Sequence, residues 1–197
     1  MSGEWAGVIE RRDFAVFGRQ LQPLTMRHLF LLITIDSPIL TGAQTDVADL
    51  LLAVWLCTWP ADVAQQSLER RTSLTTQFRA WGSSWGAKAV GDGTILAEAA
   101  VFHEYLLYWM RAPRRWGSEG GKIVTPWVLF LCSELRRHYG CSEAEVWAMP
   151  PTKAFAMYAA ISEAHGSDSL MSESDQIESD RINAEAEAEA AKKGGQP

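Results

Sequence analysis

The sequence predicts an all-α protein, with a compact domain of about six helices over residues 1–165 and a disordered acidic tail over residues 166–197. Three observations predict this class. Apolar residues recur at helical spacing in successive segments, capping and proline signals separate those segments, and the last stretch holds almost no large apolar residues. The length of 197 residues favours one folded domain.

The N-terminal residues predict a short hairpin followed by a helix. Within residues 1–23, the apolar pairs that fit strands are Val8–Ile9 and the stretch Phe14–Phe17. A first helix is expected after Pro23, with Thr25 as its N-cap. We expect it to end at residues 36–38, because a proline disfavours helix in the residue before it.

Residues 47–59 predict the centre of the fold. They are apolar on nearly every side of a helix, which is typical of a buried helix, and Thr45 or Asp46 is the expected cap. Pro60 stops this helix. We expect a polar surface helix over residues 61–80 and a turn-rich loop over residues 81–86.

A long helix is expected from the cap Thr94 to about Met110, with one apolar seam along it. The seam consists of Ile95, Ala99, Phe102, Leu106 and Trp109. A glycine-rich basic connection then leads to a helix with Thr125 as N-cap and Pro126 as its first residue.

The C-terminal half of the domain carries clear end signals. Gly140 is the expected C-terminal cap of the preceding helix, and Ser142 with Glu145 forms a capping box. A last helix is expected after residues 149–151, ending near residues 165–166.

The charge of the chain is concentrated in the tail. Residues 166–197 hold 8 of the 24 acidic and 3 of the 18 basic residues, so their net charge is −5 and that of the remainder is −1. The folded part has no basic face, which argues against nucleic-acid binding. The uncharged runs are shorter than the roughly 20 residues of a membrane helix, and the N-terminus does not resemble a signal peptide. The three cysteines predict a reducing compartment, so we expect a cytoplasmic protein without membrane contact.

Two motifs contain residue types found in zinc sites or in phosphate-binding loops, but neither has the spacing that such a site requires. Cys132, His138 and Cys141, with His103 as a fourth ligand, do not match a common zinc pattern. The loop at residues 117–122 departs from a phosphate-binding loop in its glycine spacing and lacks the metal-binding hydroxyl. We therefore expect no metal and no cofactor.

Catalytic residues are not apparent either. Glu98 and His103 are five residues apart, which places them on different sides of a helix. The serines in the loops lack the context of a hydrolase nucleophile. We expect a protein that is not an enzyme.

Two aromatic loops supply the candidate partner-binding residues. They are Trp81, Trp85, Arg114, Arg115 and Trp116. Exposed tryptophan and arginine side chains are favoured interface anchors. The alternative is that these rings fold back onto the core.

Two stretches carry a family resemblance. Residues 24–59 hold a short helix, a Ser-Pro break and an apolar helix that ends near a cysteine, and residues 145–158 read EVWAMPPTKAFAMY. Both are similar to segments of the tail assembly chaperones of long-tailed bacteriophages. The resemblance covers about a quarter of the chain.

The resemblance implies a non-enzymatic chaperone in the host cytoplasm. Such a protein binds and solubilises the long tape-measure protein and helps to recruit tail-tube subunits. The resemblance leaves open whether this chain also self-associates. It also implies a longer product made by ribosomal frameshifting, for which Lys192–Lys193 is the candidate position. The alternative is a structural virion protein, such as a head–tail connector or a minor capsid component.

Overall fold

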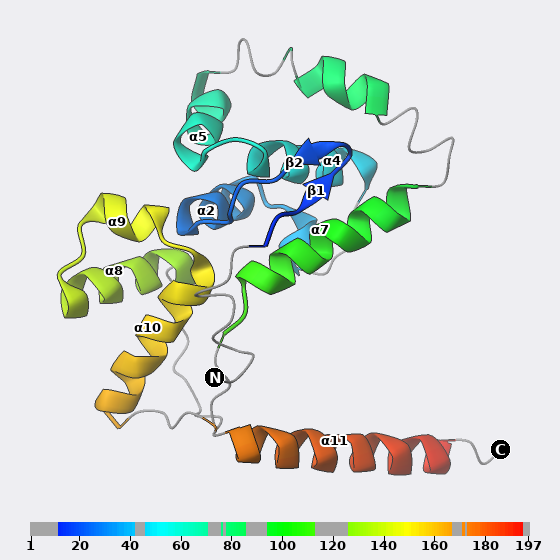
Figure 1. The fold of residues 1–197 in the computed structure, drawn as a ribbon, viewed down its shortest axis with the longest axis vertical. Helices are drawn as coiled ribbons and strands as arrows, with labels where there is room; N and C mark the ends of the chain where they lie inside the picture. The colour runs from blue at the N-terminus through cyan, green and yellow to red at the C-terminus, as the bar shows by residue number, and fades with distance from the viewer. Residues whose placement is uncertain are drawn as a thin grey trace.

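A computed structural model describes residues 12–41, 46–70, 76, 78–85, 94–112, 126–166, 171 and 173–194. It confirms the expected all-α class, and Figure 1 shows helices packed around a small N-terminal hairpin. The hairpin joins β1 (Ala15–Val16) to β2 (Arg19–Gln20) in antiparallel register, with Val16 opposite Arg19. Its two turn residues, Phe17 and Gly18, have φ angles of 50° and 68°. Positive φ at both positions matches the turn whose twist suits a tight hairpin. The other proposed strand, Val8–Ile9, lies outside the described residues.

The first helices begin where the capping signals predict. Helix α2 (Met26–Thr34) is capped by the Thr25 side chain, which accepts from the His28 N–H. After the short α3 (Pro38–Thr41), helix α4 (Val47–Cys57) is capped by Asp46. Most of α4 is buried, as its uniformly apolar sequence predicts.

The segment after α4 corrects the expected boundaries. Helix α5 spans Ala61–Arg70, and residues 78–85 are again helical where a loop was expected over residues 81–86. The serines fit this helix because the hydroxyls of Ser83 and Ser84 donate to the carbonyls of Ala80 and Trp81, one turn earlier. Burial of Trp81 stabilises the helix against the turn preference of the glycine and serines.

Helix α7 (Ile95–Trp109) packs on β1 and α4, and the predicted seam faces them. The expected cap needs a correction, because Thr94 has a helical backbone and its side chain makes no capping hydrogen bond. Glu98 instead reaches the hairpin, where its carboxylate accepts from the Phe17 N–H at 2.7 Å.

The remaining helices of the domain are α8 (Trp127–Tyr139), α9 (Glu143–Ala148) and α10 (Pro151–Ala164). Gly140 ends α8 in the left-handed region with φ 66°, and the capping box of Ser142 and Glu145 is confirmed. Pro126 occupies the cap rather than the first helical position, since its ψ of 122° is not helical. Thr125, the proposed cap, is outside the described residues.

Helix α2 connects two apolar clusters that form the core. Leu31 and Leu32 on one side of α2 join the cluster formed with the hairpin, α4 and α7. Met26 and Leu29 join the cluster formed with α8, α9 and α10. Within the second cluster the Met26 N–H donates to the Met149 carbonyl at 2.9 Å. Between the two parts, the Thr152 hydroxyl at the start of α10 donates to the Trp109 carbonyl at 2.6 Å.

The tail contains one long helix among its described residues. Residues 173–194 form α11, a helix that extends away from the domain in Figure 1. The helix preference of alanine and glutamate favours this element, and the expected disorder of the tail stays a prediction. Arg181 adds ion pairs one turn away on both sides, with Glu178 and Glu185. Within the described residues, no helix is both long and apolar enough to span a membrane.

Candidate functional site

The proposed aromatic anchors Trp81 and Trp85 pack against the hairpin, in the apolar cluster that the hairpin forms with α4 and α7. Trp81 is 6% exposed, and its ring lies 5.4 Å from that of Trp55. The Arg19 guanidinium lies over the rings of both Trp55 and Trp81, at 4.9 and 5.2 Å. For Trp81 this confirms the alternative that the ring folds back onto the core, where the apolar ring is stabilised by burial.

Trp85 is partly buried against the hairpin turn. Its ring lies 6.3 Å from that of Phe17, and a Cβ on Gly18 would approach the Trp85 ring to 3.1 Å. Glycine is therefore required at position 18 both for its positive φ and for this close approach. The other candidates, Arg114, Arg115 and Trp116, lie outside the described residues.

An apolar groove lies between α7 and the pair α3–α4, and we call it the α7 groove. Ile39, Val47 and Leu50 line one side of it, and Ile95, Ala99 and Phe102 line the other. Its volume is about 340 Å³. The polar residues among its lining are Asp46, the cap of α4, and His103. A concave, mostly apolar surface with few polar groups is typical of a binding site.

Exposed leucines extend the groove along the outside of α7. Leu96, which also lines the groove, is 78% exposed, and Leu107 is 59% exposed. They are eleven residues apart, which is three helical turns with an offset of about 20°. Ala100 and His103 lie between them on the same side and are exposed. We call these four residues the α7 leucine face.

Sequence reasoning missed this surface. The apolar seam predicted from the sequence is the side of α7 that faces the core, and it does not include Leu96 or Leu107. Two leucines outside the seam, three turns apart, were the signal that could have revealed a second apolar face. The other wall of the groove, formed by Ile39 and Val47, depends on how α3 and α4 pack.

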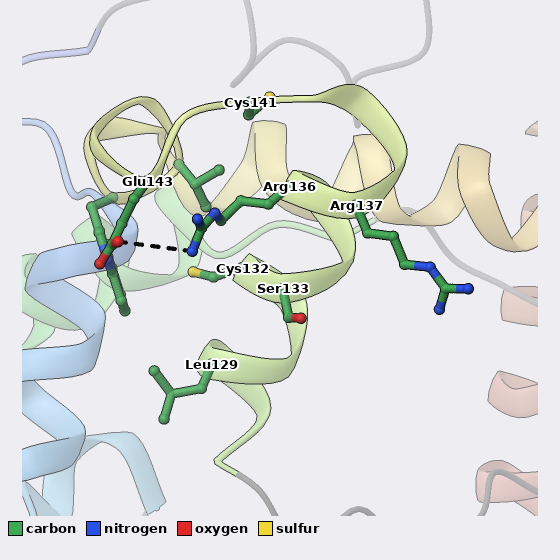
Figure 2. A pocket seen from close by; sticks show the side chains of 9 residues that line it. Leu129, Cys132, Ser133, Arg136, Arg137, Cys141 and Glu143 are labelled. Atoms are coloured by element: carbon green, nitrogen blue, oxygen red, sulfur yellow. Dashed lines mark hydrogen bonds and ion pairs between the residues drawn. The ribbon is translucent and has the colours of Figure 1, made fainter.

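A second pocket, of about 480 Å³, lies between α8 and α9. Figure 2 shows Arg136 extending from α8 toward Glu143 at the start of α9, at 3.8 Å, while the side chain of Arg137 extends in the opposite direction. Both partners of this ion pair are more than half exposed, so it stabilises the fold little.

Burial holds the Cys132 thiol of this pocket in its protonated form. Burial raises the pKa of Cys132 to about 11, although the positive charge of Arg136 opposes the shift. The thiol therefore stays protonated at neutral pH, whereas thiolate is the reactive form. Cys57 is buried more deeply, beside Tyr105, and burial raises its pKa to about 12.

The proposed zinc ligands are not brought together. Cys132 and Cys141 line the α8–α9 pocket, whereas the His138 ring packs against His165 at 5.0 Å and faces Glu134 at 3.4 Å. His103 lies in the α7 groove. Within the part of the chain that the structure describes, no three His, Cys, Asp or Glu side chains are placed to hold a metal ion. The loop at residues 117–122 is outside that part.

The chain has no match among protein-family models, curated proteins or solved structures.

Proposed function

We propose that this chain is a tail assembly chaperone of the kind found in long-tailed bacteriophages. In this proposal it binds and solubilises the tape-measure protein in the host cytoplasm, and it helps to recruit tail-tube subunits. The observation that carries the proposal is the exposed apolar surface formed by the α7 groove and the α7 leucine face. A protein that holds an aggregation-prone helical partner needs such a surface.

The packing of the two resembling stretches supports the proposal. Residues 24–59 contain α2 and α4, and residues 145–158 contain parts of α9 and α10. They are in contact: the Met26 N–H bonds to the Met149 carbonyl, and the rings of Phe30 and Trp147 lie 5.4 Å apart. The residues that carry the resemblance thus form one structural unit, as expected if they share a folding role.

The tail suits the same role. Helix α11 holds an excess of acidic residues, and Ile177 and Ile182 are its exposed large apolar side chains. A charged helix that extends from the domain keeps a complex with an apolar partner soluble through repulsion between like-charged particles.

Co-expression tests the proposal. The partner to be tested is the longest helical protein encoded beside this chain's gene, and it is expressed with and without the chain. We expect the chain to raise the soluble fraction of that protein and to co-purify with it. An unchanged soluble fraction would contradict the proposal. Mass spectrometry of purified phage particles distinguishes the chaperone from the alternative function. A structural virion protein is retained in the particles, whereas a chaperone is absent from them.

A further inference from the structure

We propose that the α7 groove and leucine face receive a single basic amphipathic helix of a partner protein. The inference rests on the proposed binding role and adds the shape and charge of the segment that is bound. It is argued from the length of the apolar surface, the charges beside it and its limited area.

The surface has the length and shape of one helix. Leu96 and Leu107 are about 16 Å apart along α7, since each residue adds 1.5 Å. Between them on the same side lie Ala100 and His103. The small side chain of Ala100 permits a second helix to approach closely beside Leu96, and apolar residues at helical spacing would reach both leucines.

The groove part of the surface is acidic. Asp46 lines the groove, and Asp49 lies beside it in the capping box of α4, with its N–H donating to the Asp46 carboxylate at 2.8 Å. Glu104 borders the leucine face, but Arg12 neutralises it at 2.7 Å, so the acidic charge is that of the two aspartates. Among the described residues that line the groove, none is lysine or arginine. Lysine or arginine beside the apolar residues of the partner would therefore complement the groove.

The limited area favours a single helix over a second copy of this chain. A stable interface buries roughly 1,200 Å² or more in total. The leucine face is one helix wide and about 16 Å long, and with the groove beside it this is less than a folded partner of this size would need. The acidic residues also oppose docking on an anionic membrane surface.

Peptide binding tests the inference directly. The probe is a fluorescein-labelled synthetic helix of about four turns, with leucines on one face and lysines elsewhere. A matched peptide carries glutamate in place of lysine. Binding to the full chain is followed by fluorescence anisotropy. We expect the lysine peptide to bind more tightly than the glutamate peptide, and its affinity to fall as salt is raised.

Variants locate the binding site. We expect Leu96→Ser and Leu107→Ser each to weaken binding of the lysine peptide about tenfold, because each removes a buried apolar contact. Asp46→Asn keeps a side chain that caps helices and removes the charge, so a loss of about twofold to fivefold is expected. Ile177→Ser removes an equally exposed apolar side chain from α11 and should leave binding unchanged.

The outcomes separate this inference from the proposed function. Equal binding of both peptides, or affinities unaffected by Leu96→Ser and Leu107→Ser, would overturn the inference. A change in the sedimentation coefficient caused by the same substitutions would indicate a second copy on this face and would also overturn it. If the leucine variants still solubilise the tape-measure protein, the chaperone role stands and the binding site proposed here does not.

Discussion

The buried hydrogen bond between Thr152 and Trp109 offers a direct test of how the two halves of the domain are joined. Thr152 lies in the first turn of α10, and its hydroxyl donates to the carbonyl at the end of α7 at 2.6 Å. Both residues are buried, at 1% and 5% exposure. The α7 carbonyl lies in the last turn, where helical hydrogen bonding provides no partner. The hydroxyl therefore satisfies an acceptor that water does not reach.

The perturbation is Thr152→Val, which keeps the shape of the side chain and removes the donor. Leaving the Trp109 carbonyl buried without a donor should lower the free energy of unfolding by about 1–3 kcal/mol. For a domain of this size, a loss of about 2 kcal/mol corresponds to a decrease in Tm of roughly 4–8 °C. Urea unfolding followed by tryptophan fluorescence, together with thermal unfolding followed by circular dichroism, measures both quantities.

Thr152→Ser is the matched control, because it keeps the hydroxyl and removes one methyl group. We expect it to cost about 1 kcal/mol, less than the valine variant. The reasoning is refuted if the valine variant is as stable as the unmodified chain, or if the serine variant is the less stable of the two. Either result would mean that the methyl contact, rather than the hydrogen bond, joins α10 to α7.

The other predictions concern one histidine, two glycines and two cysteines. Burial lowers the pKa of His28 in the folded chain, against the opposing effects of its hydrogen bond to the Trp59 carbonyl and of Asp62. The unfolded chain then binds the proton more readily, so the free energy of unfolding should fall as the pH decreases below about 6.5. The fall should be less steep in His28→Gln. Urea unfolding at a series of pH values measures it, and an equal dependence on pH in both chains would contradict the prediction. Gly140→Ala should lower the free energy of unfolding by about 1 kcal/mol, because φ is 66° there. Gly82 lies in a helix with open space around it, so Gly82→Ala should raise the free energy of unfolding by a similar amount. A change of the same sign in both variants would contradict the prediction. In the native state a thiol reagent should modify Cys141 quickly and Cys57 only on unfolding, and mass spectrometry of the labelled peptides would reveal the opposite order if it occurred.

Local signals in the sequence were sufficient for most helix boundaries. The caps at Thr25, Asp46 and Ser142 follow from a side chain that accepts a hydrogen bond from a backbone N–H three residues later, and such bonds need no distant partner. The left-handed end at Gly140 is equally local. The buried seam of α7 followed from its apolar spacing alone.

The expected loop over residues 81–86 failed because it depended on a distant contact. Residues 81–85 have turn-forming composition, yet they are helical because Trp81 is buried against Trp55, some 26 positions earlier in the chain. In the tail, the alanines, the glutamates and the Arg181 ion pairs are local signals that favour helix over residues 173–194.

The sequence alone determined the all-α class, the main caps and the inner face of α7, because hydrogen bonds within one turn and the helical repeat act over a few residues. Tertiary structure decided which side chains remain exposed. Trp81 entered the core, whereas Leu96 and Leu107 stayed on the surface beside a groove that α3 and α4 complete. The exposure of a side chain depends on every element packed around it, so the binding surface was set by packing between segments that are far apart in the chain.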